Sequence, residues 1–450
     1  MSISNPYPNL VHSRRLSKEG LWIIFGQAMA VIGSLFGLRV LTGLMDPEAY
    51  GELSLAMTAA MLVNQTVFGP LAGGAARFYA PAQEKGNFAG YFSALQRLVL
   101  SATGIILLAL LIIVAGLALA GRAGYTGITA AAFIFAILSG YSTILVGIQN
   151  SARQRSVVAL RQGMEPWARF MFAAFLITLT GAAAAAAMAG YLLSALLILG
   201  TQAVFFLRIT AQGRAHIPAT DSKPTDWRRL LVEYSWPSAT WGILLWVYLS
   251  SGRWALQFFN STADTGYYAV LFQLGYYPFM MLAAMGVQFL SPVYFQRAGD
   301  SSDPARLYGV FKLAWRVTLL SFIGMLFITA LAYFFHKPIF HLLAAPAYGQ
   351  VSRFMPLLVL ASGLFASSHF CAMAMQSQKT TNILLLPKNV SYVVGALFTF
   401  AGAAYSGLAG VVYAMVITNL FHFIWVALLL KREMNRLQIS AANGNTYAGK

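Results

Sequence analysis

Long apolar stretches alternate with short polar segments along almost the whole chain. Runs of about 20 apolar residues have the length that an α-helix needs to cross a bilayer. Backbone polar groups in lipid must be hydrogen-bonded internally, which a helix achieves. The pattern therefore predicts an all-α, polytopic membrane protein with about twelve transmembrane helices. The predicted spans are 20–42, 50–70, 90–119, 127–148, 163–182, 185–207, 234–257, 266–291, 313–335, 353–376, 383–404 and 408–430.

The composition agrees with this pattern and offers little for catalysis. Of the 450 residues, 58% are hydrophobic and 10% are charged, against about 25% charged in a soluble protein. The single cysteine, Cys371, excludes an intrachain disulfide. The chain has no P-loop, no paired metal-ligand spacing and no nucleophile elbow. We therefore predict that the protein is not an enzyme and has no cofactor or metal site, and we leave any coupling ion unidentified.

The net charge of +17 is concentrated in the short segments between spans. Twelve spans place 25 of the 30 Lys and Arg residues on one side, Arg153 and Arg169 among them. Positive residues are enriched on the cytoplasmic side of membrane proteins. The distribution therefore predicts a multi-pass protein with both termini in the cytoplasm.

The longest polar interruption, residues 208–229, divides the spans into six and six. We predict a cytoplasmic N-terminal segment at 1–19, a six-helix bundle at 20–207, a cytoplasmic linker at 208–232, a second six-helix bundle at 233–432 and a disordered cytoplasmic tail at 433–450. Residues 39–55 and 253–270 each contain an arginine, a polar turn and a new apolar helix, at an offset near 215. This indicates two bundles related by a parallel pseudo-twofold repeat.

Short phrases in both halves resemble a known family: GQ at 26–27, RVL at 39–41, DPEAYG at 46–51, ADTGYY at 263–268 and YSGLAG at 405–410. The chain resembles the polysaccharide transporter branch of the multidrug/oligosaccharidyl-lipid/polysaccharide exporter superfamily, the O-antigen-type flippases. The resemblance implies a V-shaped pair of six-helix bundles that work by alternating access in the bacterial cytoplasmic (inner) membrane. It implies flipping of an undecaprenyl-diphosphate-linked oligosaccharide from the inner to the outer leaflet for surface polysaccharide synthesis. The implied partners are that lipid-linked substrate, membrane lipids, a polysaccharide polymerase and chain-length proteins.

Three arginines, Arg39, Arg253 and Arg353, lie within apolar runs. A charge at mid-membrane costs at least about 2.5–3.5 kcal/mol, and the guanidinium fork suits bidentate contact with phosphate. We interpret them as candidate contacts for a diphosphate. The alternative is that each side chain reaches the nearby interface.

Uncharged polar residues interrupt several spans. Gln27, Asn64, Gln65, Gln273 and Tyr276 are candidates for hydrogen bonds with sugar hydroxyls, and the alternative is ordinary hydrogen bonding between helices. Arg77 and Arg153 are candidates for headgroup contact at the cytoplasmic mouth, and positive-inside anchoring is the alternative. Small residues at 26, 30, 33 and 37 predict close helix packing, and His369 and His422 are interpreted as packed hydrogen-bonding partners.

The positions of the acidic residues help to distinguish between the possible functions of the protein. The carboxylates closest to spans, Glu52, Glu165 and Glu233, lie near helix ends in this sequence interpretation. A cation-coupled multidrug exporter of the same superfamily is the main alternative function, and it needs a carboxylate deep in the membrane. A non-transporting scaffold for glycan assembly enzymes is a third hypothesis, and the polar interruptions in the helices argue against it.

Overall fold

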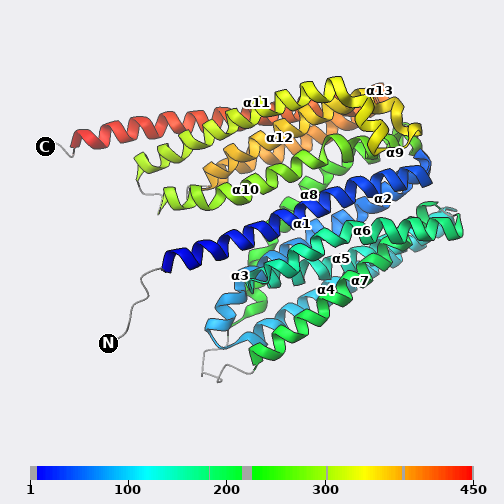
Figure 1. Cartoon of the computed structure of the whole chain (residues 1–450), viewed down its shortest axis with the longest axis horizontal. Helices are drawn as coiled ribbons and strands as arrows, with labels where there is room; N and C mark the ends of the chain where they lie inside the picture. The colour runs from blue at the N-terminus through cyan, green and yellow to red at the C-terminus, as the bar shows by residue number, and fades with distance from the viewer. Residues whose placement is uncertain (1–7, 182, 215–224, 300–302, 378–380, 448–450) are drawn as a thin grey trace. The chain divides into compact units, whose positions relative to one another are not determined.

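The computed structural model describes residues 8–181, 183–214, 225–299, 303–377 and 381–447, and these are helical apart from short connections (Figure 1). The first elements are α1 (Pro8–Leu44), α2 (Pro47–Val63), the π-helix η1 (Asn64–Phe68), α3 (Gly69–Glu84), α4 (Phe88–Leu119), η2 (Ala123–Tyr125), α5 (Thr126–Ser151), α6 (Arg155–Thr180) and α7 (Ala183–Arg214). There follow α8 (Trp227–Phe259), α9 (Thr262–Gly275), α10 (Tyr277–Ala298), α11 (Pro304–Leu343), η3 (Pro346–Phe354), α12 (Met355–Gln376), η4 (Thr381–Leu384) and α13 (Leu385–Tyr447).

Nine stretches among the described residues are long and apolar enough to cross a membrane. They account for ten of the predicted spans, because α13 contains both 383–404 and 408–430. The other two, 163–182 and 234–257, fall on α6 and α8, whose polar and charged side chains lower their hydropathy. Each predicted span thus coincides with one helix or with consecutive helices in the described part of the chain.

Helix α13 is two antiparallel helices joined by a one-residue reversal. Gly407 has φ 57° and ψ −137°, a conformation outside the helical region that suits glycine. On either side of it, a Cβ on Gly402 would meet the backbone of Gly410, and one on Gly395 would meet Thr418. The contacts Gly402–Gly410 and Gly395–Thr418 are nearly symmetrical about Gly407, so the two helices of α13 pack against each other along their length.

The chain forms two compact units, residues 1–246 and 247–450, and the division falls inside α8. The predicted bundles at 20–207 and 233–432 remain predictions. Of the predicted linker 208–232, residues 215–224 lie outside the described residues, while 208–214 belong to α7 and 227–232 to α8. The tail predicted to be disordered, 433–450, differs from the structure, where α13 continues to Tyr447. The helix continues because Leu430, Met434 and Leu437, spaced at i, i+4 and i+7, all pack on the apolar core of the second unit.

In the first unit, α6 packs between α1 and α7 through small residues. A Cβ on Gly26 would meet the backbone of Ala159 in α6, and one on Gly190 of α7 would meet the backbone of Ala173. Trp167 of α6 donates a hydrogen bond of 3.1 Å from Nε1 to the carbonyl of Met29. The small-residue positions of α1 therefore serve close packing, as predicted.

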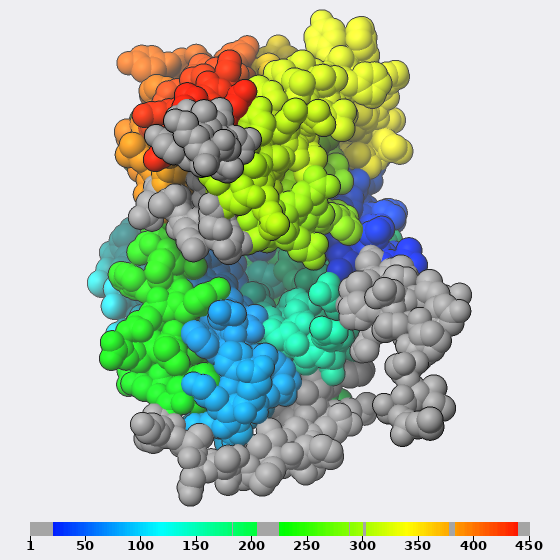
Figure 2. All heavy atoms as spheres, turned by 90° about the vertical axis from the view of Figure 1, so that its left-hand side faces the viewer, coloured from blue at the N-terminus to red at the C-terminus, as the bar shows by residue number. Residues whose placement is uncertain are grey.

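The second unit is built around α12, whose residues are almost all buried. Its core joins Tyr294 of α10, Phe311 of α11, Cys371 of α12 and Leu430 of α13. Figure 2 shows the ends of α10 and α11, in yellow-green, lying against the red end of α13. This packing leaves α12 shielded on several sides, so polar side chains on it face protein.

Both units interrupt their second membrane-crossing element. In the first, η1 separates α2 from α3, and in the second Tyr276 separates α9 from α10. Each break contacts the helix that carries the fourth predicted span of its unit: Asn64 bonds to α5, and Ser362 of α12 donates to the carbonyl of Gly275 at 3.2 Å. The two units thus have a helix break in the corresponding element, and each break contacts the corresponding helix, which agrees with an internal repeat.

Candidate functional site

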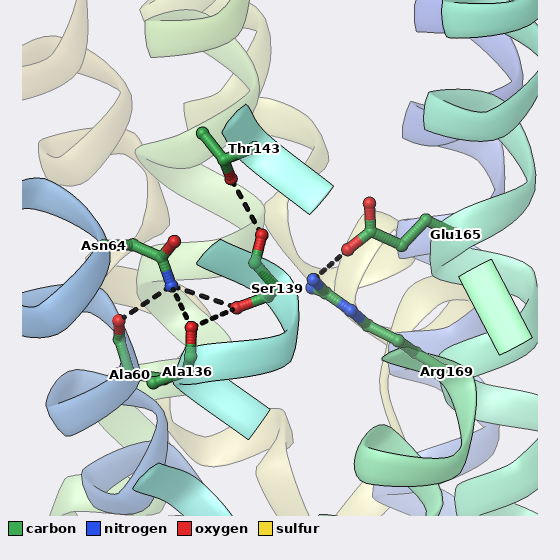
Figure 3. A network of polar contacts seen from close by, with 7 residues as sticks. All are labelled: Ala60, Asn64, Ala136, Ser139, Thr143, Glu165 and Arg169. Atoms are coloured by element: carbon green, nitrogen blue, oxygen red, sulfur yellow. Dashed lines mark hydrogen bonds and ion pairs between the residues drawn. The ribbon is translucent and has the colours of Figure 1, made fainter. Parts of the chain in front are cut away.

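Asn64 ties the π-helix η1 to α5 (Figure 3). Its Nδ2 donates to the carbonyl of Ala60 at 3.1 Å, to the carbonyl of Ala136 at 3.4 Å and to Ser139 Oγ at 3.0 Å. A π-turn disturbs the regular backbone pattern, and the amide restores part of that bonding while it crosses to the neighbouring helix. The structure thus gives Asn64 the interhelical role that was the alternative to sugar binding.

We expect Asn64→Ala to lower the stability of the protein. The variant leaves the carbonyl of Ala136 and the hydroxyl of Ser139 without this partner, at a cost of about 1 kcal/mol for a membrane hydrogen bond. The measurement is the thermal melting temperature in detergent. Thr143→Ala is the matched control, because Thr143 is exposed and bonds only to the carbonyl of Ser139 within its own helix. Equal melting temperatures for both variants would contradict the role of Asn64.

The next residue, Gln65, lies where α8 crosses the interrupted helix. A Cβ on Gly242 of α8 would meet the carbonyl of Gln65, and Trp246 donates from Nε1 to the carbonyl of Thr58 at 2.7 Å. The Gln65 side chain is half-buried, and its Oε1 has no hydrogen-bond partner among the described residues. The Oδ1 atom of Asn64 is likewise buried without a hydrogen-bond partner among the described residues, so each of the two amides keeps one acceptor unpaired.

Arg39 and Gln27 are both half-buried on α1. Arg39 lies about 7.5 Å from the end of α1 at Leu44, taking 1.5 Å per residue. Near it, Thr42 donates to the carbonyl of Leu38 at 2.8 Å. Gln27 follows Gly26, which is in close contact with α6. The two side chains therefore lie about 18 Å apart along the helix and do not form one site.

Arg253 and Tyr276 are brought together by Phe272 of α9. The guanidinium carbon of Arg253 lies 5.1 Å from the centre of the Phe272 ring, and the same ring stacks on Tyr276 at 4.7 Å. Thr265 donates to the carbonyl of Arg253 at 3.3 Å, which fixes α8 against α9. Gln273 is half-buried one residue further along α9. Three of the predicted binding residues thus lie in one region of the second unit.

The same region contains a buried cluster of tyrosines and histidine that sequence reasoning did not identify as a site. We call Tyr248, Tyr276, Tyr392, Asn419 and His422 the tyrosine–histidine cluster. Tyr248 stacks on Tyr392 at 5.5 Å, and Tyr392 lies 6.3 Å from His422. The side chain of Asn419 lies close to both Tyr248 and Tyr276. All five side chains are buried.

The histidines have hydrogen-bond partners, as predicted. His422 Nδ1 lies 3.0 Å from Ser391 Oγ, and His369 Nδ1 lies 2.9 Å from the carbonyl of Phe365. Lys388, which is 4% exposed, adds a cation close to both rings. The cluster comes from α8, the break at Tyr276 between α9 and α10, and both halves of α13, so no spacing within one segment reveals it.

The remaining predicted arginines are exposed. Arg353 lies on η3 with its guanidinium carbon 4.9 Å from the centre of the Phe354 ring. Arg77 lies on α3, and Arg153 occupies the turn between α5 and α6 with φ 58°. The structure does not bring these three side chains into the buried clusters, and their contact with a headgroup remains a prediction.

The structure places Glu165 and Arg169 within α6. Sequence analysis puts Glu165 near the end of a span and Arg169 on the cytoplasmic side, which remain predictions, and α6 itself begins at Arg155, eight residues before the predicted span. Arg169 lies about 21 Å along the helix at 1.5 Å per residue, near its middle. Arg169 Nη2 donates to Glu165 Oε1 one turn earlier (Figure 3). A carboxylate therefore lies well within α6.

Neither a family model nor a curated protein matches the chain. Solved structures match its fold at low sequence identity. An inward-facing multidrug resistance MATE family transporter of the MOP superfamily has a TM-score of 0.69 and 12% identity, over 93% of this chain and 99% of that one. The lipid II flippase MurJ in an inward closed conformation has a TM-score of 0.68 and 9% identity, over 94% and 90%. The Vibrio cholerae MATE transporter VcmN in the bent form has a TM-score of 0.54 and 13% identity, over 94% and 99%.

These likenesses show the fold. The described residues form an all-α fold with nine stretches long and apolar enough to cross a membrane, and this fold is similar to that of the MATE transporters and MurJ. The solved structures that share this fold are described as a multidrug resistance transporter and a lipid II flippase. The polysaccharide transporter branch, the substrate and the orientation in the membrane remain predictions, because the same fold hosts both drug exporters and a lipid-linked flippase.

Proposed function

We propose that the protein is a flippase that moves an undecaprenyl-diphosphate-linked oligosaccharide from the inner to the outer leaflet of the bacterial cytoplasmic membrane by alternating access. The distribution of charge within the helices carries this proposal. The six predicted spans of the second half contain no Asp or Glu. In the same unit Arg253 is half-buried and Lys388 is buried. The second unit thus has cations and hydrogen-bonding aromatic groups in its interior.

A unit of this kind favours an anionic, sugar-bearing molecule over a cationic drug. An arginine stays protonated at any physiological pH, and its planar fork matches phosphate oxygens. Charges inside a low-dielectric region interact more strongly than in water, so an organic cation is repelled where a diphosphate is attracted. Tyrosine and asparagine side chains supply the donors and acceptors that sugar hydroxyls need.

The proposal is tested by deleting the gene and complementing the deletion. Loss of surface polysaccharide, with lipid-linked repeat units accumulating on the cytoplasmic side and rescue by the wild-type chain, is the expected result. A polysaccharide polymerase and chain-length proteins act after this step in the proposed pathway, so their own substrates become depleted. Unchanged polysaccharide together with new sensitivity to cationic drugs would reject the flippase.

A cation-coupled multidrug exporter is the second candidate, and one observation favours it. Glu165 is a carboxylate ten residues into α6, and sequence analysis places it near the end of a predicted span. Its partner Arg169 lies four residues away on the same face. Because the pair already neutralises the carboxylate, Glu165 is less suited to hold a cation than an isolated carboxylate is. We therefore rank this function below the flippase.

A further inference from the structure

The ion pair between Glu165 and Arg169 lies inside the first unit and is accessible. The Arg169 side chain is 30% exposed and that of Glu165 is 32% exposed. Ionisable residues within membrane helices face the bundle interior or a water-filled cavity, because charge in lipid is costly. About a third of each side chain of this pair is thus open to contact with a molecule from outside the first unit.

The lipid-facing side of α6 can be recognised by its exposed apolar residues. Leu160, Met164, Met171, Phe175 and Leu179 are each at least 47% exposed and recur at helical spacing. Glu165 and Arg169 lie on a different face, about 100° or more around the helix from this stripe at 100° per residue. Instead, the guanidinium of Arg169 lies over two aromatic rings, 5.1 Å from Phe135 of α5 and 5.9 Å from Tyr191 of α7.

The aromatic contacts connect the pair with the Asn64 network. Phe135 and Ser139 are one turn apart on α5, so their side chains are neighbours on one face. Ser139 accepts the hydrogen bond from Asn64 at 3.0 Å. Figure 3 shows the two groups in one view, with Asn64 and Ser139 opposite Glu165 and Arg169. Arginine, carboxylate, hydroxyl and amide groups therefore lie around the same part of α5.

The hydrogen bonding of Arg169 is incomplete. A guanidinium has five N–H donors, and the bond to Glu165 uses one oxygen and one nitrogen. Arg169 Nε is buried and has no hydrogen-bond partner among the described residues. A buried donor without an acceptor is costly. A second oxyanion that reached Nε would complete the planar fork of donors that guanidinium offers to carboxylate and phosphate groups.

We propose that Arg169 is a binding residue for the diphosphate of the transported lipid. While no substrate is bound, the Glu165 carboxylate forms the ion pair with the Arg169 guanidinium in place of the diphosphate. The proposal rests on the flippase function and deepens it by adding a site in the first unit. Exchanging one anion for another keeps the guanidinium paired throughout, which avoids the penalty of an uncompensated charge. The released Glu165 carboxylate is a third exposed and can return to water.

The experiment measures binding of farnesyl diphosphate to the purified full chain in nanodiscs, with farnesol as the uncharged comparison. Arg169→Gln is expected to weaken binding of the diphosphate by about tenfold or more, because a charge-assisted bidentate contact is lost. Glu165→Gln is expected to tighten it by a similar factor, because the internal competitor is gone. The double variant should behave like Arg169→Gln, since Glu165 acts only through the arginine.

The chain supplies its own control pair. Arg229 and Glu233 are also four residues apart and form an ion pair of 2.7 Å at the start of α8, but their side chains are 74% and 56% exposed. Arg229→Gln and Glu233→Gln should leave the affinity unchanged. Arg169→Lys keeps the charge without the fork, and it should give an intermediate affinity even if Arg169→Gln fails to fold.

Wild-type affinity for the diphosphate in folded Arg169→Gln, or in Arg169→Lys if only that variant folds, would overturn the site and leave the flippase intact. Normal polysaccharide in the deletion strain would overturn the flippase whatever the binding result. Equal binding of farnesol and farnesyl diphosphate by the wild type would also overturn the site. A loss in Arg169→Gln with a gain in Glu165→Gln supports the exchange.

Discussion

Replacing Arg39 and Arg253 together by alanine is expected to reduce glycan export to the level of the deletion strain. The two arginines occupy matching places in the internal repeat, within α1 and α8, and both are half-buried. Each arginine is expected to contact the diphosphate on part of its path across the membrane. Without both arginines, the negative charge of the diphosphate has no nearby positive charge, and in a low-dielectric interior water does not compensate for that loss. Each single variant should retain partial export, because the other arginine remains.

The measurement is surface polysaccharide in complemented cells, together with the amount of the variant in the membrane and its melting temperature. Arg122→Ala is the control, because Arg122 is an exposed arginine at the turn before η2. Arg39→Lys and Arg253→Lys retain the charge and should preserve more export than the alanine variants. Full export by a folded double alanine variant would exclude the arginines from the mechanism.

The second large effect is expected at Gly190, and it concerns folding. A Cβ at this position would meet the backbone nitrogen and Cα of Ala173, so α6 and α7 cannot both keep their places. Gly190→Leu should destabilise the first unit by about 3 kcal/mol, at the upper end of typical overpacking costs because backbone yields less than side chains. We expect little folded protein by size-exclusion chromatography in detergent.

Gly116→Leu in α4 is the matched control for Gly190→Leu. Gly116 is a helical glycine in a more apolar helix than α7, and nothing lies within 4 Å of a Cβ placed there. This variant should fold at least as well as the wild type, since glycine is a poor residue in a helix interior. If both leucine variants gave the same yield, the tight contact between α6 and α7 would not be required.

Hydropathy predicted the helices well because a bilayer imposes a length and an internal hydrogen-bonding requirement on each one. It predicted the helix ends less well. Polar residues at the start of α6 hide the beginning of the helix at Arg155, so Glu165, ten residues along α6, was placed near its end. Where a helix enters the membrane obliquely or lines water, apolar runs understate its length.

The tyrosine–histidine cluster marks another limit of sequence reasoning. Tyr276 was predicted as a binding residue from its polar neighbourhood in the sequence, but Tyr248 and Tyr392 come from elements far apart along the chain. Their stacking depends on how α8 and α13 pack, which local periodicity does not encode. A buried tyrosine in an apolar span is by itself compatible with simple packing. The tyrosine–histidine cluster differs from ordinary packing because several such residues from distant parts of the chain come together in it.

The reversal of chain direction at Gly407 constrains how the last two helices insert into the membrane and fold. Helical hairpins are ordinarily joined by two to five residues, whereas here a single glycine separates two helices that touch backbone to backbone at Gly402 and Gly410. We therefore expect the last two membrane helices to insert as a pair. A nascent chain that ends just after Gly407 has a glycine-lined groove and no partner helix to fill it. Completion of the second unit thus waits for synthesis of the final helix, and chains truncated within α13 should be substrates for membrane quality control.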